Sequence, residues 1–270
     1  MANMLTMKNV SKVFNGNTIN ENKVFDKFNI NIKDGEFVTI IGSNGAGKST
    51  LLNLISGNIK ADCGSIVIDE EEVVNKEEYY RSKYIGRVYQ DPTVGVAPNM
   101  NILENISLAD NKGKPFGMKL AIDKKKIEYY RDILRSLNLG LEEKLYSKVN
   151  LLSGGQRQAL TLIMAVIADP KILLLDEHTA ALDPKTSIKI MNITNEIVRK
   201  NKITTLMVTH NIKQAIESGN RLLMMHEGKT VVDVKGKEKE KLNIDKLIEL
   251  FGKTDLQDVL SDRSLLSSLR

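Results

Sequence analysis

The sequence predicts an α/β fold in which helices cover a mostly parallel sheet. Strands and helices alternate in the second half of the chain: the apolar run KILLLD at 171–176, a helical pattern around 184–200, the strand ITTLMVTH at 203–210 and a helix from about Asn211. Such alternation is typical of βαβ units. A glycine-rich loop at 42–50, between a strand and an apolar helical pattern, favours the same fold class.

The N-terminal part of the chain is predicted to form strands followed by one helix. The segments MLTMKNVSKVF at 4–14 and DKFNINIKDGEFVTIIG at 26–42 are rich in β-branched and aromatic residues, and the second contains a turn at 34–35. The helix is expected to begin at Lys48 and to end at Gly57, because glycine is the usual C-cap residue.

A helical insertion is predicted from Asp91 to about Asn150. The segment NILENISLA contains a capping box, with Asn101 as N-cap and Glu104 three residues later. In DKKKIEYYRDILRSLNLG, helical spacing gathers four apolar side chains on one face. These are Ile127, Tyr130, Leu134 and Leu137.

The C-terminal part differs in character from the rest. VKGKEKEKL at 234–242 is expected to be an exposed charged link, and NIDKLIELF at 243–251 a short amphipathic helix. This helix is interpreted either as a docking or dimer-contact segment or as an ordinary surface helix.

Composition limits the classes of protein that the chain can represent. Of the 270 residues, 41% are hydrophobic and 27% charged, which allows a full core. The single cysteine, Cys63, cannot form an internal disulfide, and neither a leader peptide nor an apolar run of about 18 residues is visible. We therefore expect a cytoplasmic protein that another chain holds at any membrane. The net charge of +5 suits an anionic ligand, a membrane surface or nucleic acid, but equally a solvated lysine-rich surface.

The loop GSNGAGKST at 42–50 matches the phosphate-binding loop pattern. Its glycines permit a tight turn, its backbone N–H groups can surround phosphates, and Lys48 can reach the β- and γ-phosphates. Ser49 is the expected Mg²⁺ ligand.

Two further strands end in residues that suit nucleotide chemistry. The apolar run ILLL carries its strand to Asp176, which could hold the Mg²⁺ shell, and Glu177 could accept a proton from an attacking water. His210 ends the strand TTLMVTH, so it should reach the same edge of a parallel sheet and contact a γ-phosphate.

The segment LSGGQ at 152–156 predicts a second helix start that can bind an anion. Ser153 is an N-cap, Gln156 completes a capping box, and the two glycines between them leave backbone N–H groups accessible. A capped helix that needs glycines only for packing is the structural alternative.

Together these motifs resemble the ATPase domain of ATP-binding cassette (ABC) proteins over roughly residues 4–230. The resemblance implies that the Walker A loop binds ATP through Gly42, Ser43, Asn44, Gly45, Ala46, Gly47, Lys48, Ser49 and Thr50. It implies catalytic roles for Glu177, His210, Lys48 and the Q-loop residue Gln90, and Mg²⁺ coordination by Ser49, Gln90 and Asp176. Phe14 falls where the family often stacks an aromatic ring on adenine, although a core position is the alternative.

The same resemblance implies that the second anion site serves a partner. Two cassettes of this family pack head to tail, so that the signature of one closes on the nucleotide of the other. The residues expected to act in trans, including the D-loop aspartate, are Ser153, Gly154, Gly155, Gln156 and Asp183. A homodimer with two composite sites is therefore expected.

The family also implies a domain organisation. A P-loop NTPase domain of the ABC type is expected at 1–230, with a mostly parallel core, an N-terminal antiparallel β subdomain and a helical subdomain inserted at about 91–160. The charged link and short helix occupy 231–270.

One position departs from the family pattern. The family usually has proline after the Walker B acid pair, whereas this chain has His178. We expect a less constrained backbone after Glu177 and an added titratable group. Either protonation of His178 makes the ATPase pH-sensitive between about 6 and 7, or the histidine replaces proline without any functional consequence.

The predicted function is to power an ABC importer of a small solute. The segments DEHTAALDPKT, TLMVTHN and LMMHEGK resemble a subgroup of bacterial importer ATPases. For that subgroup, aromatic amino acids are the suggested cargo. The expected partners are a membrane permease and, indirectly, a substrate-binding protein, and no nucleic acid. The protein would lie peripherally on the cytoplasmic face of the cell membrane. Exposed apolar residues after Gln90, namely Val94, Val96 and Met100, are candidates for the permease contact. A soluble ABC ATPase acting on nucleic acid or ribosomes is the alternative.

Overall fold

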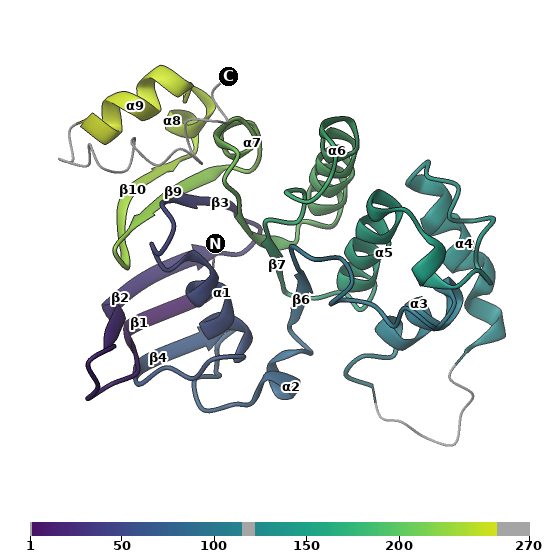
Figure 1. Ribbon diagram of the computed structural model, residues 1–270, viewed down its shortest axis with the longest axis horizontal. Helices are drawn as coiled ribbons and strands as arrows, with labels where there is room; N and C mark the ends of the chain where they lie inside the picture. Colours follow the sequence, from purple (N-terminus) through teal and green to yellow (C-terminus); the bar gives the residue numbers. More distant parts are fainter. Residues whose placement is uncertain (1, 115–121, 253–270) are drawn as a thin grey trace. The chain divides into compact units, whose positions relative to one another are not determined.

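The computed structural model describes residues 2–114 and 122–252, and it divides the chain into two compact units (Figure 1). The first unit, called here the sheet unit, combines Met1–Arg81 with Lys202–Arg270. The second, called the helical unit, comprises Ser82–Asn201. Each unit contains both strands and helices, and each is described by itself.

The sheet unit begins with an antiparallel sheet. Its strands are β1 (Asn3–Phe14), β2 (Asn22–Lys33), β4 (Cys63–Ile68) and β5 (Glu71–Glu72), in the order β2-β1-β4-β5. Buried and exposed residues alternate along the second half of β2, as expected for a strand with one face on a core. This sheet is the N-terminal antiparallel β subdomain that the sequence predicted.

A second set of strands in this unit is mostly parallel. Strand β3 (Phe37–Gly42) is buried along its whole length and pairs in parallel with β8 (Thr204–Val208) and β9 (Arg221–His226). Strand β10 (Lys229–Lys235) pairs antiparallel with β9, so the order is β10-β9-β3-β8. A strand buried on both faces needs a continuous apolar run, which explains why β3 reads FVTIIG rather than alternating.

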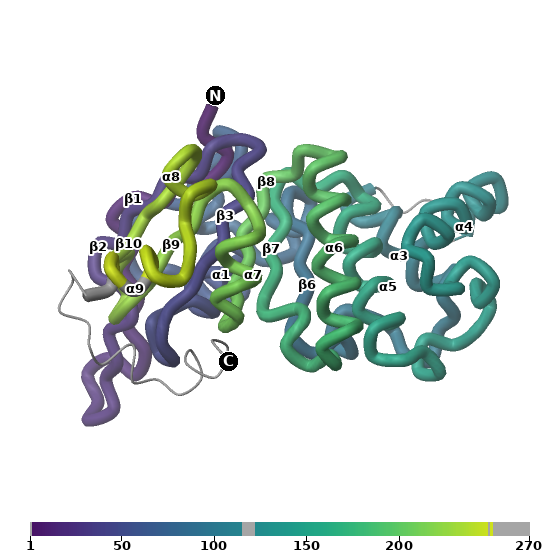
Figure 2. The backbone as a smooth tube through the Cα atoms, turned by 90° about the horizontal axis from the view of Figure 1, so that it is seen from above, coloured from purple at the N-terminus to yellow at the C-terminus, as the bar shows by residue number. Residues whose placement is uncertain are grey.

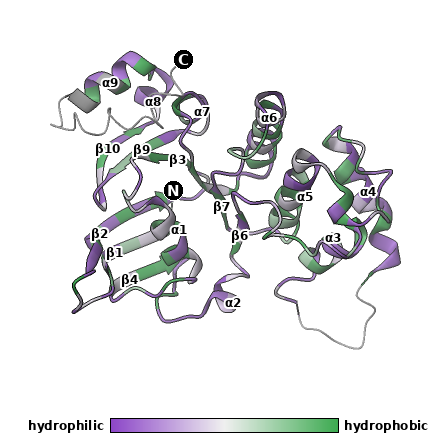
Figure 3. Cartoon of the chain, in the orientation of Figure 1, coloured by the Kyte–Doolittle hydropathy of each residue, from purple (hydrophilic) through white to green (hydrophobic). Residues whose placement is uncertain are grey.

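Five helices belong to the described part of the sheet unit: α1 (Lys48–Ser56), α2 (Glu78–Arg81), α7 (Ile212–Glu217), α8 (Lys237–Glu240) and α9 (Ile244–Gly252). The predicted limits of α1 are confirmed, since its C-cap Gly57 has φ 83° and donates its N–H to the carbonyl of Asn53. The predicted α9 is also confirmed, and it carries both hydrophobic and hydrophilic residues (Figure 3).

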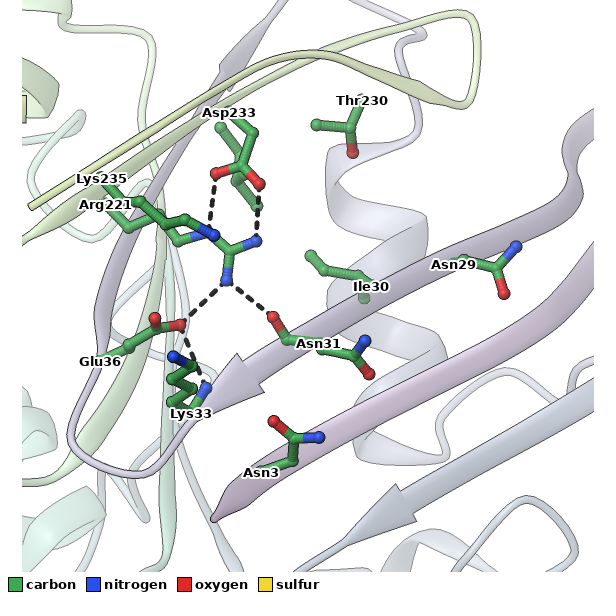
Figure 4. A pocket seen from close by; sticks show the side chains of 11 residues that line it. Asn3, Asn29, Ile30, Asn31, Lys33, Glu36, Arg221, Thr230, Asp233 and Lys235 are labelled. Atoms are coloured by element: carbon green, nitrogen blue, oxygen red, sulfur yellow. Dashed lines mark hydrogen bonds and ion pairs between the residues drawn. The ribbon is translucent and has the colours of Figure 1, made fainter. Parts of the chain in front are cut away.

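An arginine joins the two strand systems of the sheet unit beside a pocket of about 320 Å³ (Figure 4). Arg221 on β9 is 7% exposed, and its guanidinium donates to Asp233 on β10, to Glu36 and to the carbonyl of Asn31 on β2. All three guanidinium nitrogens therefore have partners. Hydrogen bonds to Asp233 and Glu36 raise the pKa of Arg221 despite its burial.

The helical unit contains two parallel strands, β6 (Ile85–Val88) and β7 (Ile172–Asp176). Its α-helices are α3 (Ile102–Asp110), α4 (Ile127–Ser136), α5 (Gly154–Val166) and α6 (Pro184–Asn201), and single 3-10 turns lie at Lys124–Lys126 and Val149–Leu151. Figure 2 shows α3, α4 and α5 close together in this unit. The inserted helical subdomain is confirmed as a feature of the fold.

The predicted apolar face of α4 is confirmed. Tyr130, Leu134 and Leu137 are buried in one cluster with residues of α3 and α5, and Ile127 packs against it. The predicted capping box of α3 is present as well, since Asn101 accepts the N–H of Glu104 and the Glu104 side chain accepts the N–H of Asn101.

Two expectations about exposure are wrong. Lys239 in the predicted exposed link is only 3% exposed, because its ammonium group turns inward to backbone carbonyls. Val96, expected on the surface, is partly buried against the helical core, whereas Val94 and Met100 are exposed as predicted. Within 2–114 and 122–252, none of the helices has both the length and the apolar composition needed to cross a bilayer.

Candidate functional site

The glycine-rich loop connects the buried strand β3 to α1 in the sheet unit. Glycine is required at Gly42, since a Cβ there would lie 2.1 Å from the carbonyl oxygen of Met225. It is also required at Gly47, the N-cap of α1, where φ is 96° and a Cβ would approach Phe25 at 3.0 Å. The loop is thus held closely against its own unit by two positions that accept no side chain.

The electrostatics of this loop suit an anion. Lys48 is 6% exposed, and its ammonium group donates to the carbonyls of Gly42 at 2.7 Å and Ser43 at 2.9 Å. The first turn of α1 contains no acidic residue, so the positive end of the helix dipole is not neutralised there. Ser49 is exposed and Thr50 half-buried. Together the loop and helix start form a site of the kind that binds phosphate groups.

The structure brings His210 to the same edge of the sheet as this loop. In the parallel pairing of β3 and β8, Ile40 lies opposite Val208, and Gly42 and His210 each follow two residues later. Thr209 donates its N–H to the carbonyl of Ile40, which fixes the chain just before His210. The half-buried histidine therefore follows a strand end that is adjacent to the loop, as the sequence predicted.

Phe14 occupies the end of β1 in the sheet unit. Its side chain is half-buried and does not belong to the buried core, so the core alternative is wrong. The ammonium group of Lys12 lies 5.4 Å from the centroid of the Phe14 ring. An aromatic ring with an accessible face can stack on a base.

The acidic pair belongs to the helical unit. Asp176 is the last residue of β7, and Nη2 of Arg87 on the neighbouring strand β6 lies 3.4 Å from its Oδ2. The Arg87 guanidinium also lies 4.5 Å above the ring centroid of Tyr89. The sequence analysis did not identify Arg87. A charged residue in the short, largely buried strand IGRV was nevertheless a signal, because buried charges are usually paired with an opposite charge.

Glu177 adopts an uncommon backbone conformation. Its φ is 46°, in the left-handed region, and its carbonyl accepts the N–H of Ala180 at 2.9 Å. The side chain is half-buried. Non-glycine residues in this region cost free energy and occur often at functional sites.

His178, next in the chain, corrects an expectation. It is 2% exposed, and its Nε2 lies 3.1 Å from Oγ1 of Thr194, whose hydroxyl donates to the carbonyl of Ile190. With the Thr194 hydroxyl donating to Ile190, its oxygen can accept a proton from Nε2 of His178. Burial lowers the pKa of His178 to about 4, so the expected titration between pH 6 and 7 is wrong.

The signature segment forms the start of α5 as predicted. Ser153 accepts the N–H of Gln156 at 3.3 Å, and the Gln156 side chain accepts the N–H of Ser153 at 3.2 Å. The two glycines differ in their surroundings. A Cβ on Gly155 would lie 2.3 Å from Cγ2 of Thr186, whereas one on Gly154 would meet only Leu182 at 3.7 Å. Packing therefore requires glycine at position 155. The alternative that the glycines serve only to pack the helix explains Gly155 but does not explain Gly154.

Two more predicted residues lie in the helical unit. Gln90 is exposed, and the carbonyl of the half-buried Tyr89 before it accepts a 3.4 Å hydrogen bond from the fully buried Gln158 of α5. Asp183 accepts the N–H of Thr186 at 3.1 Å at the start of α6. Hydrogen bonds from the side chain and backbone of Thr186 lower the pKa of Asp183. The predicted site residues are thus divided between the two units.

Comparison with known proteins identifies the family. The family model described as ABC transporter matches residues 25–180. The tyrosine transport ATP-binding protein of Clostridioides difficile is 51% identical over 248 residues, covering 92% of this chain and 98% of that protein. The xylose/arabinose import ATP-binding protein of Sulfolobus acidocaldarius is 34% identical, covering 93% and 94%.

Solved structures agree with these relatives. A dimeric post-hydrolysis ATP-binding cassette bound to ADP and Pi is 31% identical, with a TM-score of 0.72, and the match covers 86% of this chain and 98% of that one. The ADP conformation of another ABC transporter cassette is 27% identical, with a TM-score of 0.74, covering 93% and 99%. The chain belongs to the ABC transporter family, as an ATP-binding and ATP-hydrolysing subunit whose relatives are largely of the importer type.

Proposed function

We propose that this subunit powers the import of an aromatic amino acid, with tyrosine as the first candidate. The observation that carries the proposal is the 51% identity, over nearly the full length of both chains, to a tyrosine transport ATP-binding protein. Other relatives are importer subunits for sugars, polyamines and phosphonates, which favours import over the alternative of a soluble ATPase acting on nucleic acid.

The sheet unit supplies the nucleotide-binding groups of the proposed site. Phe14 stacks on adenine, the backbone of residues 42–50 surrounds the phosphates, and Lys48 leaves its loop carbonyls to contact the β- and γ-phosphates. The 2.7 and 2.9 Å hydrogen bonds of Lys48 show that its ammonium group already lies inside the loop. Little rearrangement is needed for it to meet an anion there.

We infer that Mg²⁺ would arrive with ATP and be held by side-chain oxygens of this chain together with the phosphates. In the part of the chain that the structure describes, no three His, Cys, Asp or Glu side chains gather into a metal-binding group. Mg²⁺ is commonly held by one or two protein oxygens together with phosphates and water. We assign Ser49, Gln90 and Asp176 to this role, and Mg²⁺ would supply charge neutralisation at the β- and γ-phosphates.

Hydrolysis is assigned to Glu177 and His210. Glu177 accepts a proton from the attacking water, and its uncommon left-handed backbone, directly after β7, is of the kind found at functional sites. His210 contacts the γ-phosphate, since it follows the strand end beside the phosphate loop. Gln90 couples the nucleotide to the surface that follows it in the sequence.

We further propose that two copies form the working enzyme. Ser153, Gly154, Gly155, Gln156 and Asp183 of one copy act on the nucleotide of the other. Gly154 supports this proposal, because only Leu182 would approach a Cβ there and the helix start remains accessible. The solved cassette bound to ADP and Pi is itself dimeric.

The permease contact is assigned to an exposed apolar surface of the helical unit. Val94 is 61% and Met100 41% exposed, and Tyr146 and Leu151 are exposed on a neighbouring segment. Two backbone hydrogen bonds hold these segments together. The N–H of Val149 donates to the carbonyl of Met100, and the N–H of Asn150 donates to the carbonyl of Pro98. Such a contact would place the protein at the cytoplasmic face of the membrane, where a substrate-binding protein acts through the permease.

Transport by the complete assembly tests this proposal. The chain is co-expressed with a candidate permease, and uptake of labelled tyrosine is measured in cells that lack their own tyrosine transporters. Uptake should require both chains and be lost with Lys48→Ala. Unlabelled phenylalanine and tryptophan define the substrate class by competition, with xylose and spermidine as negative competitors. Uptake that only xylose or spermidine inhibits would contradict the aromatic assignment but not the importer assignment.

A further inference from the structure

The helix that follows His210 is too short to hold its own position. Helix α7 comprises only the six residues Ile212–Glu217, and isolated helices of this length are unstable in water. Its N-cap Asn211, adjacent to His210, accepts the N–H of Gln214 at 3.0 Å. The orientation of α7, and with it the backbone beside His210, must therefore be set by contacts with the rest of the sheet unit.

Lys239 makes such contacts at the far end of α7. Its ammonium group donates to the carbonyls of Ala215 at 2.9 Å and Ser218 at 3.3 Å, and also to the carbonyl of Ile216. These are carbonyls of the last turn, which have no acceptor role inside the helix. A cation at this end also interacts favourably with the helix dipole. Lys239 is only 3% exposed, and all three N–H donors of its ammonium group are directed at the C-terminal end of this short helix.

The same helix end is fastened to the strand that leads into the phosphate loop. The hydroxyl of Thr39 on β3 donates to the carbonyl of Ala215 at 2.9 Å. Lys239 and Thr39 therefore share one acceptor, and α7 is held between β3 on one side and the C-terminal segment on the other. Burial lowers the pKa of Lys239 to about 8, which leaves most of the ammonium group protonated at neutral pH.

Apolar packing extends this attachment toward His210. Leu242 and Leu247 are buried in one cluster with Ile212 and Ala215 of α7 and with Ile41 of β3. Figures 1 and 2 both show α8 and α9 beside α7. Ile212 lies only two residues after His210, so the C-terminal segment contacts both ends of α7.

We propose that Lys239 is a positioning residue for ATP hydrolysis: by holding the last carbonyls of α7, it fixes the helix that begins beside His210. Lys239 contacts neither the phosphate loop nor Phe14, so it acts on turnover and not on nucleotide binding. The inference rests on the γ-phosphate role assigned to His210 under the proposed function.

The test compares Lys239→Met, which keeps an unbranched apolar side chain one atom shorter and removes the ammonium group, with Lys237→Met. Lys237 is an exposed residue of the same short helix, α8, and serves as the matched control. In the full-length protein, kcat for ATP should fall about tenfold in Lys239→Met, as expected for a misplaced catalytic group. KM should stay within about twofold, because ATP binding is untouched. Lys237→Met should match the wild type in both.

Hydrogen exchange separates positioning from general loss of structure. In Lys239→Met, amides of 209–218 should exchange faster, while those of α1 keep their wild-type protection. Faster exchange throughout the chain, or a kcat equal to that of Lys237→Met, would overturn the inference. If Lys239→Met does not fold, Leu247→Ala provides the second variant, since Leu247 packs against the same helix without any charge.

A double variant separates this inference from the assignment of His210. If Lys239 acts through His210, then Lys239→Met should slow His210→Ala no further. Additive losses would mean that Lys239 acts by another route. A wild-type kcat in His210→Ala would instead refute the role of His210 under the proposed function, and exchange of 209–218 would still report whether Lys239 holds α7.

Discussion

The guanidinium group of Arg221 forms two parallel hydrogen bonds, each 2.8 Å long, with the carboxylate of Asp233. The remaining nitrogen donates to Glu36 at 2.9 Å and to the carbonyl of Asn31 at 2.7 Å, so one side chain connects β9, β10 and β2 (Figure 4). Bidentate pairs of this kind fix geometry as well as adding free energy.

Removing this arginine should destabilise the sheet unit. We expect Arg221→Met to lower the free energy of unfolding by about 3 kcal/mol, because Glu36, whose side chain is only 15% exposed, loses its charged donor. This value lies at the lower end of the range for breaking a buried ion pair, because the Asp233 side chain is 37% exposed and can be solvated. Urea unfolding followed by circular dichroism measures it. Lys235→Met, at an exposed residue lining the same pocket, should change stability by less than about 0.5 kcal/mol.

The signature glycine Gly154 should act on the nucleotide of the partner. Gly154→Asp places a negative charge where a phosphate is expected to dock, and the space beside residue 154 admits the side chain. An aspartate in the first turn is favourable for α5 itself, so the protein should fold and the monomer should bind ATP. ATP-induced dimerisation, seen by size-exclusion chromatography in a Glu177→Gln background, should disappear. The nearly isosteric Gly154→Asn should retain part of it.

Mixing variants tests whether this action is in trans. A dimer of one Gly154→Asp chain and one Lys48→Ala chain has one site with both lesions and one intact site. Partial recovery of ATPase activity in the mixture is therefore expected. Loss of ATP binding by monomeric Gly154→Asp would show instead that the signature acts within its own chain.

The carboxylate of Glu177 should be needed for hydrolysis and not for binding. Replacing it by the isosteric amide in Glu177→Gln removes the proton acceptor, so kcat should fall about a hundredfold or more while the Kd for Mg-ATP stays unchanged. Single-turnover hydrolysis and equilibrium dialysis measure the two quantities. Turnover near the wild-type rate would assign the base elsewhere, with His210 as the next residue to test.

His178 should affect acid stability rather than the pH dependence of catalysis. Its pKa is about 4 in the folded protein and near 6.5 when unfolded, so between these values the unfolded chain binds the proton more strongly. The free energy of unfolding should fall as the pH drops through this window, by up to about 1.4 kcal/mol per pH unit. His178→Gln keeps a donor for Thr194 but does not titrate.

The measurement is Tm against pH for both proteins. The slope between pH 6.5 and 4.5 should be shallower in His178→Gln, while the two ATPase profiles between pH 6 and 8 should superimpose. Equal slopes would mean that His178 does not remain neutral in the folded protein, and a shifted ATPase profile would restore a catalytic influence for it.

Local patterns predicted the features that short stretches of chain control. The limits of α1 followed from Lys48 and Gly57, because a left-handed C-cap is a property of glycine itself. Both capping boxes, at Asn101 and Ser153, were predictable since each needs only a donor and an acceptor three residues apart. The parallel strands that carry Gly42 and His210 to one sheet edge followed from alternating elements and apolar runs.

Residues whose environment depends on distant parts of the chain were not predictable in this way. Arg87 meets Asp176 only because β6 and β7 pair, and Val96 is covered only because the helical cluster forms beside it. The sequence by itself determined the fold class, the family and the local form of each motif, because these depend on residue type and spacing. Tertiary structure decided the burial of His178 and Lys239, because desolvation and hydrogen-bond partners arise from segments that meet only in the folded chain.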